Sequence, residues 1–255
     1  MQSLGILGVG ELTEKLVLGL RRSGYAGAIL LSPRNAQRAA ALAEECACGI
    51  MPDNQSVVEG SEAVILGVRP DALDEVAREV AFKPNQLLVS LAAGVGLRRL
   101  AEAFPSARVV RGMLSYAAQI NQTTVVLCPS DRAAEGLLGA LGTLVVLQDE
   151  PAFELATVAA CMNGWFYFFL DDLQKWLGER GLPAEQARAL VLGNMQDCVA
   201  SAMGQPAKSL RALGEAIATP GTYTAEGLEA LERHGASAAW AAACDRVHER
   251  LSGRA

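Results

Sequence analysis

The first 34 residues of the chain constrain its fold more than any other segment. An apolar run at residues 4–7 predicts a short strand, and the turn Gly8-Val9-Gly10-Glu11-Leu12-Thr13 follows it directly. Leucines then recur with a helical period over residues 12–20, and residues 28–31 form a second apolar run. Strand, glycine turn, helix and strand in this order predict a dinucleotide-binding βαβ unit.

The glycine turn has the residue types that pyrophosphate binding requires. Gly8 allows a tight turn after the strand, and Gly10 lets the backbone approach a phosphate with no Cβ in the way. The following helix directs its free N–H groups and its positive dipole end at the same place. We therefore predict cofactor contacts at Gly8, Gly10, Glu11 and Leu12. Thr13 departs from the pattern, which has Gly or Ala there, and a purely structural turn is the alternative.

The residues at the end of the second strand indicate which dinucleotide binds. NAD enzymes place Asp or Glu there to hold the ribose 2′-hydroxyl, whereas this chain has Ser32 and Arg34. A guanidinium pairs well with a phosphate through its charge and its forked donors. We therefore predict NADP(H), with Ser32 and Arg34 as contacts. The alternative is that Arg34 is an ordinary surface charge.

Length and charge exclude several classes of protein. The 255 residues suffice for one large or two small domains. A net charge of −6 without a basic run argues against nucleic acid and anionic membranes as partners. The uncharged stretch 155–170 is shorter than the roughly 20 residues of a membrane span, and the first strand leaves no room for a signal peptide. We expect a cytoplasmic protein.

The cysteines predict free thiols rather than a metal site. Of the six, only Cys46 and Cys48 are close in sequence, and His234 and His248 lie far from them, which is no standard zinc spacing. Free thiols fit a reducing compartment. We expect no bound metal.

The chain changes character near residue 150. Before it, strands and helices alternate, with strands expected at 63–68, 87–91, 108–111, 123–127 and 144–147, and helices at 35–46, 71–80 and 97–103. This alternation predicts an α/β fold with a doubly wound, mostly parallel sheet over residues 1–150. Because ligands of such sheets bind outside the carboxyl ends of the strands, the turns at 8–10, 68–70 and 92–94 should line one crevice.

Residues 151–255 predict a helical domain without strands. Residues 155–177 form a long helix that is apolar nearly all round in its first part, which indicates burial against a second subunit. Gly181-Leu182-Pro183 ends that helix and starts the next. Further helices are expected at 184–203, 206–218, 223–233 and 236–251.

Several segments resemble one family in their order and spacing, over nearly the whole chain. They are Gly5-Ile6-Leu7-Gly8-Val9-Gly10, Asp53-Asn54 with residues 63–70, Ser90-Leu91-Ala92-Ala93-Gly94-Val95, Gly181-Leu182-Pro183, and Thr219-Pro220-Gly221-Thr222-Tyr223-Thr224 with Gly227-Leu228. Together they are similar to the pyrroline-5-carboxylate reductases. The resemblance implies a Rossmann-type domain followed by an all-α dimerisation domain, and NADPH-dependent reduction of a cyclic imine by a homodimer that can assemble further.

The resemblance also implies site residues. Further cofactor contacts would be Asn54, Val68, Arg69, Pro70, Ala92, Ala93 and Gly94. A turn or cap is the alternative for Asn54, and a surface role for Arg69. Thr224 takes the position of the threonine that hydrogen-bonds the substrate nitrogen, and this single donor suits hydride addition to a carbon–nitrogen double bond. Its alternative is a helix cap.

Two segments depart from the family where it borders the substrate. Met113-Leu114-Ser115-Tyr116-Ala117 replaces Met-Pro-Asn-Thr-Pro, and in Met162-Asn163-Gly164-Trp165-Phe166-Tyr167 only Gly164 and Tyr167 keep the family's register. The family's Gly-Gly pair is Gly221-Thr222 here. The expected substrate neighbours are Met113, Ser115, Tyr116, Gly164, Trp165, Thr219, Gly221 and Thr222.

Two other functions remain open from the sequence. A β-hydroxyacid dehydrogenase has the same layout but needs a helix lysine a few residues after a glycine pair, and Lys175 lies too far from Gly164. A non-catalytic homologue that binds NADP(H) fits the loss of Met-Pro-Asn-Thr-Pro.

Overall fold

The computed structural model describes residues 1–253 and divides into two compact units. The first unit is Met1–Ala160 and the second begins at Cys161. The division falls inside helix α7 (Glu150–Gly178), a little after the change of pattern near residue 150.

The first unit contains one sheet of eight strands in the order β3-β2-β1-β4-β5-β6-β7-β8. The strands are β1 (Ser3–Leu7), β2 (Ala28–Leu31), β3 (Gly49–Ile50), β4 (Ala63–Leu66), β5 (Leu87–Ser90), β6 (Arg108–Met113), β7 (Thr123–Cys128) and β8 (Gly142–Val146). All neighbours pair in parallel except β6 and β7. The predicted α/β fold with a mostly parallel sheet is confirmed, and the strand order reverses between β1 and β4.

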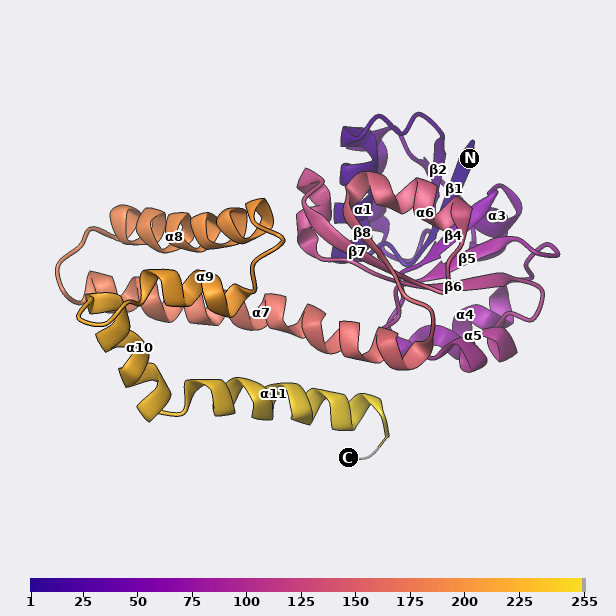
Figure 1. Ribbon diagram of the computed structural model, residues 1–255. Coiled ribbons are helices and arrows are strands. Elements are labelled where there is room, and N and C mark those ends of the chain that lie inside the picture. The colour runs from indigo at the N-terminus through magenta and orange to yellow at the C-terminus, as the bar shows by residue number, and fades with distance from the viewer. Residues whose placement is uncertain (254–255) are drawn as a thin grey trace. The chain divides into compact units, whose positions relative to one another are not determined.

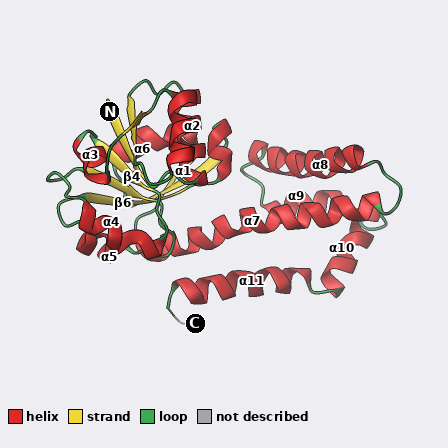
Figure 2. Cartoon of the chain, turned by 180° about the vertical axis from the view of Figure 1, so that it is seen from behind, coloured by secondary structure: helices red, strands yellow, loops and turns green. Residues whose placement is uncertain are grey.

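Helices cover both faces of this sheet, as Figures 1 and 2 show. One face carries α1 (Glu11–Arg22), α2 (Ala36–Cys46) and α6 (Arg132–Leu138), and the other carries α3 (Asn54–Glu59), α4 (Leu73–Glu79) and α5 (Leu97–Ala103). Side chains alternate along β4, so Ile65 joins Leu16 in one core and Val64 joins Val76 in the other. Burial on both faces explains why this strand is apolar throughout. Short 3₁₀ turns lie at Pro70–Ala72 (η1), Tyr116–Ile120 (η2) and Gly139–Leu141 (η3).

The second unit is helical throughout its described residues. It contains most of α7 and the helices α8 (Ala184–Gly204), α9 (Leu210–Ile217), α10 (Tyr223–Arg233) and α11 (Ala236–Leu251). Gly181 has φ +100°, the left-handed conformation that a helix end favours, and Pro183 occupies the position directly before α8. Trp240 packs against Trp165, Phe166 and Phe169, with ring centroids 5.7–6.4 Å apart.

Helix α7 exposes much of its apolar surface within one chain. It has 29 residues, and its most apolar 18-residue window has a mean hydropathy of 1.2 and is only 11% buried. By length and composition alone it could cross a membrane, because the helix extends well beyond the uncharged stretch 155–170. The predicted long helix is confirmed, and its burial against a second subunit stays a prediction.

Most predicted elements have the expected type, and the misses are short. The helices at 97–103, 223–233 and 236–251 are confirmed at both ends. The missed elements are the strand β3 with two residues and the helices α3 and α6 with six and seven, each too short for a pattern of recurring apolar positions to identify it. The helix expected at 206–218 begins only at Leu210, because Ser209 caps it by accepting from the Ala212 N–H.

Candidate functional site

The glycine turn leaves the sheet where the strand order reverses. Gly8 has φ +89°, and an added Cβ there would lie 2.7 Å from Val68 Cγ1, so both conformation and space require glycine. An added Cβ at Gly10 would meet nothing within 4 Å. The turn is therefore packed on the Gly8 side and open on the Gly10 side, next to the first N–H groups of α1. This bare backbone cradle fits a dinucleotide pyrophosphate.

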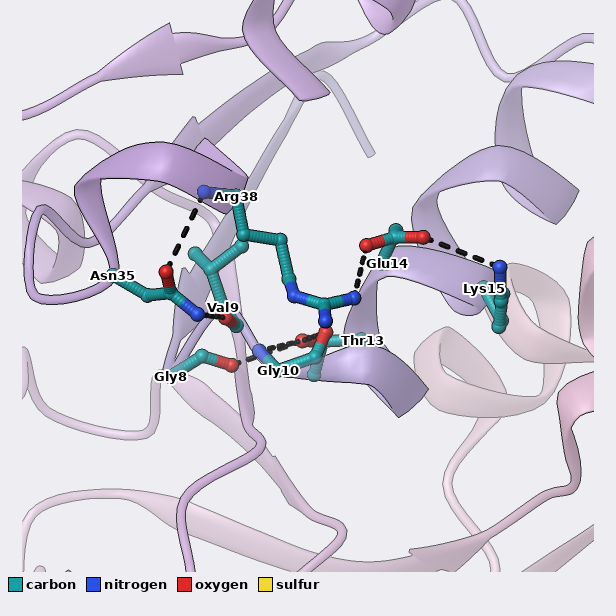
Figure 3. A network of polar contacts seen from close by, with 8 residues as sticks. All are labelled: Gly8, Val9, Gly10, Thr13, Glu14, Lys15, Asn35 and Arg38. Atoms are coloured by element: carbon teal, nitrogen blue, oxygen red, sulfur yellow. Dashed lines mark hydrogen bonds and ion pairs between the residues drawn. The ribbon is translucent and has the colours of Figure 1, made fainter. Parts of the chain in front are cut away.

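Thr13 braces the turn from inside α1, as Figure 3 shows. Its Oγ1 accepts a hydrogen bond from the Gly10 N–H at 2.9 Å and donates one to the Gly8 carbonyl at 2.9 Å. A small third residue normally allows close packing of helix and strand. Here the space for the Thr13 methyl group comes from Gly67, where an added Cβ would overlap Thr13 Cγ2. The departure from the glycine motif is thus compensated on the neighbouring strand end.

The end of β2 is tied to the same turn. Ser32 is 1% exposed, and its Oγ accepts from the Gly8 N–H at 3.0 Å. Asn35 Nδ2 donates to the Val9 carbonyl at 3.0 Å (Figure 3). The Ser32 hydroxyl therefore supports the turn as an acceptor and keeps its own O–H as a donor, so the predicted phosphate contact stays a prediction.

Two arginines lie beside this turn, and each pairs with a carboxylate. Arg34 has a 63% exposed side chain with Nη1 3.2 Å from Glu75 Oε2. Arg38 pairs with Glu14 of α1 (Figure 3). Arg38 is not among the residues predicted from the sequence, although its place in the first turn of the helix after Arg34 was an available signal.

The turns after β4 and β5 reach the same edge of the sheet as the glycine turn. Val68 is half-buried against Gly8, whereas Arg69 and Pro70 are exposed, and Arg69 forms no ion pair within residues 1–253. Gly94 has φ +72° and open space around it. Ala92 is buried and Ala93 is exposed.

Asn54 is the first residue of α3, and its side chain donates a hydrogen bond to Glu79 at 2.5 Å. The residue that caps this helix is Asp53, which accepts from the Ser56 N–H.

The segment after β6 supplies an exposed phenol. Met113 ends β6, and Ser115 caps η2 by accepting from the Ala117 N–H at 3.3 Å. Tyr116 is 51% exposed. Desolvation, and then the nearby Glu11 carboxylate, raise the pKa of Tyr116. The structure thus associates Tyr116 with the first residue of α1.

In the second unit, Thr222 and Thr224 have different roles. Thr222 caps α10: its Oγ1 accepts from the Ala225 N–H at 3.2 Å and donates to the Thr219 carbonyl at 2.7 Å. Thr224 is exposed, and its hydroxyl makes no hydrogen bond within residues 1–253. The turn requires glycine at Gly221, where φ is +84°. The Thr222 hydroxyl therefore caps the helix, and the predicted substrate contact of Thr222 stays a prediction.

Trp165 lies in the aromatic cluster of the second unit, and its predicted place beside the substrate stays a prediction. It is partly buried, and its ring packs 6.1 Å from that of Trp240. Gly164 has open space around it. Trp165 therefore contributes to the aromatic core of the second unit.

Comparisons with known proteins agree with this two-part organisation. A family model described as NADP oxidoreductase coenzyme F420-dependent matches residues 3–94, and one described as pyrroline-5-carboxylate reductase dimerisation matches residues 152–253. The chain is 30% identical to the pyrroline-5-carboxylate reductase of Pseudomonas aeruginosa, over 92% of this chain and 93% of that one. It is 27% identical to the pyrroline-5-carboxylate reductase of Haemophilus influenzae, over 88% of this chain and 87% of that one. The 1-pyrroline-5-carboxylate reductase structure from Streptococcus pyogenes superposes with a TM-score of 0.84 at 26% identity, over 98% of both chains. The chain belongs to the pyrroline-5-carboxylate reductase family.

Proposed function

We propose that this protein uses NADPH to reduce the carbon–nitrogen double bond of a cyclic imine, with pyrroline-5-carboxylate as the first candidate substrate. The observation that carries the proposal is the 30% identity to a pyrroline-5-carboxylate reductase over 92% of the chain. The glycine turn at the point where the sheet order reverses supports the cofactor half of the proposal.

The chain's own residues would hold the cofactor at the carboxyl edge of the sheet. The open backbone at Gly10 and the N-terminus of α1 suit the pyrophosphate, and Arg34 suits the 2′-phosphate. Gly94 and Arg69 border the same edge. When bound, NADPH supplies the hydride.

Thr224 is the proposed hydrogen-bond donor to the substrate nitrogen. As the imine carbon accepts hydride, the π electrons move to nitrogen. If the imine is already protonated, this gives the neutral amine directly; if the imine is neutral, the nitrogen becomes negatively charged and takes a proton from water. A hydroxyl donor at nitrogen stabilises that charge by about 1–3 kcal/mol. The free hydroxyl of Thr224 supports this role, because Thr222 already fills the capping role.

The apolar surface of the second unit supports a homodimer that assembles further, and the free cysteines support a location in the cytoplasm. A groove of about 520 Å³ between α7 and α8 is lined by Leu170, Leu173, Trp176, Leu177, Leu190, Val191, Asn194, Met195 and Cys198. A second copy covering this surface removes the need for a membrane around α7. The six free cysteines suit a reducing compartment.

The test is NADPH oxidation by the purified protein with pyrroline-5-carboxylate, beside five- and six-membered cyclic imines. Turnover of pyrroline-5-carboxylate supports the full proposal. Turnover of another imine keeps the reaction and changes the substrate. Tight NADPH binding without turnover across the panel would instead favour the non-catalytic homologue. The β-hydroxyacid dehydrogenase alternative gains no support, since Lys175 pairs with Asp171 at 2.6 Å on an exposed face.

A further inference from the structure

Hydrogen bonds of the neighbouring residues fix the backbone of Arg34, whereas its side chain forms an ion pair with Glu75. The hydrogen bonds of Ser32 to Gly8 and of Asn35 to Val9 fix the chain on both sides of Arg34 relative to the glycine turn. The guanidinium, however, points to a carboxylate of α4, with Nη1 3.2 Å from Glu75 Oε2.

This ion pair crosses the end of β1. Arg34 follows β2 and Glu75 lies on the helix after β4, and these two strands flank β1 in the sheet. A bond between the two segments therefore runs across the place where the glycine turn leaves the sheet. A ligand that enters this crevice and uses the guanidinium meets Glu75 as a competitor.

We propose that Glu75 is a specificity-determining residue that occupies Arg34 in the free protein and is displaced by the cofactor 2′-phosphate. The inference rests on the proposed use of NADP(H). A carboxylate and a phosphate are alternative acceptors for the same guanidinium donors. The phosphate carries more charge than the carboxylate and displaces Glu75. Because the Arg34–Glu75 ion pair is broken in this exchange, the free energy gained on binding NADPH is smaller. Glu75 thereby lowers the ratio of the affinity for NADPH to the affinity for NADH.

The pair is exposed on both sides, with side chains 63% and 49% exposed, so its effect is modest. Exposed ion pairs contribute up to about 1 kcal/mol, which corresponds to about a fivefold change in affinity. We expect Glu75→Gln to lower the Kd for NADPH about two- to fivefold and to leave the Kd for NADH unchanged.

The chain offers a matched control on the same helix. Asp74, the preceding residue, pairs with Arg99 of α5, away from the β2 end. Asp74→Asn removes the same charge from α4 and should leave both affinities unchanged. In an Arg34→Ala background, Glu75→Gln should produce no gain, because the shared guanidinium is absent.

The experiment is isothermal titration calorimetry of this 255-residue chain and the four variants with NADPH and with NADH. A gain specific to NADPH that vanishes in Arg34→Ala supports the proposal. Equal affinities in wild type and Glu75→Gln overturn it, as does weaker NADH binding by Glu75→Gln, which would make Glu75 a ribose ligand. A different result would refute the proposed cofactor itself. This would be a wild-type protein that binds NADPH no more tightly than NADH, or an NADPH preference that Arg34→Ala leaves unchanged.

Discussion

The methyl group of Thr13 occupies the space that a side chain at Gly67 would fill. Thr13 is the third residue of the glycine motif on α1, and Gly67 directly follows β4. An added Cβ at Gly67 would overlap Thr13 Cγ2 and lie 3.1 Å from the Gly8 carbonyl. A threonine on the helix, larger than the usual Gly or Ala, is thus accommodated because the residue after β4 is glycine.

This relationship predicts that Gly67→Ala destabilises the protein by about 1–3 kcal/mol, the usual effect of overpacking a close-packed site. Thr13→Ser removes only the methyl group and keeps the hydroxyl that bonds Gly8 and Gly10. The double variant Thr13→Ser/Gly67→Ala should therefore recover most of the lost stability. Urea unfolding of the four proteins measures the coupling, and strictly additive effects would contradict the proposed overlap.

Thr222 and Thr224 should separate stability from catalysis. Thr224→Val removes a free hydroxyl, so we expect turnover with the imine substrate to fall by about 10- to 100-fold, with the unfolding midpoint unchanged. Thr222→Val removes the cap of α10 and should lower the free energy of unfolding by about 1 kcal/mol. Initial rates and thermal melts on both variants provide the comparison. Intact turnover in Thr224→Val would exclude its catalytic role.

Arg111 forms the most deeply buried ion pair of the first unit. It is 2% exposed, lies 2.7 Å from Glu154 and 3.0 Å from Glu150, and stacks 4.2 Å from the Phe153 ring. Glu150 also accepts from the Leu97 N–H at 2.6 Å, so the cluster joins β6, α5 and α7.

Arg111→Met should therefore lower the free energy of unfolding by about 3 kcal/mol, because two carboxylates lose their cation in a poorly solvated place. Arg108→Met is the matched control on the same strand. Arg108 pairs with Asp131 at 2.7 Å but is 38% exposed, so its loss should amount to less than about 1 kcal/mol. Chemical denaturation of both variants at neutral pH tests this, and equal losses would show that burial does not set the difference.

The Cys48 thiol predicts a loss of stability at alkaline pH. Burial raises the pKa of Cys48 from its ordinary value near 9 to about 11, and the Arg21 cation offsets only part of that effect. Because the folded pKa is the higher one, the stabilisation is complete below pH 9 and is lost as the pH rises towards 11. Cys48→Ala should flatten the fall in unfolding free energy over that interval relative to wild type. An identical pH profile for the two proteins would contradict the pKa shift.

Local sequence patterns were sufficient for much of the fold. Most of the first unit's strands and helices follow from apolar runs and helical periods, with β3, α3 and α6 as the exceptions, and the switch to helices near residue 150 is visible without tertiary information. Sequence patterns did not predict very short elements such as β3. They also did not show which of two nearby threonines caps a helix and which one keeps a free hydroxyl. Thr222 and Thr224 are alike in sequence, and only the hydrogen bonds of Thr222 identify the cap.

The sequence by itself determined the dinucleotide-binding βαβ unit, the helical second half and the absence of an acid at the end of β2, because these depend on neighbouring residues. The tertiary structure alone decided which distant groups meet: Thr13 with Gly67, and Arg34 with Glu75. These contacts depend on the strand order β2-β1-β4, which brings segments far apart in the chain to one edge of the sheet. Sheet order is set by the packing of both apolar faces together, and no local pattern of residues encodes it.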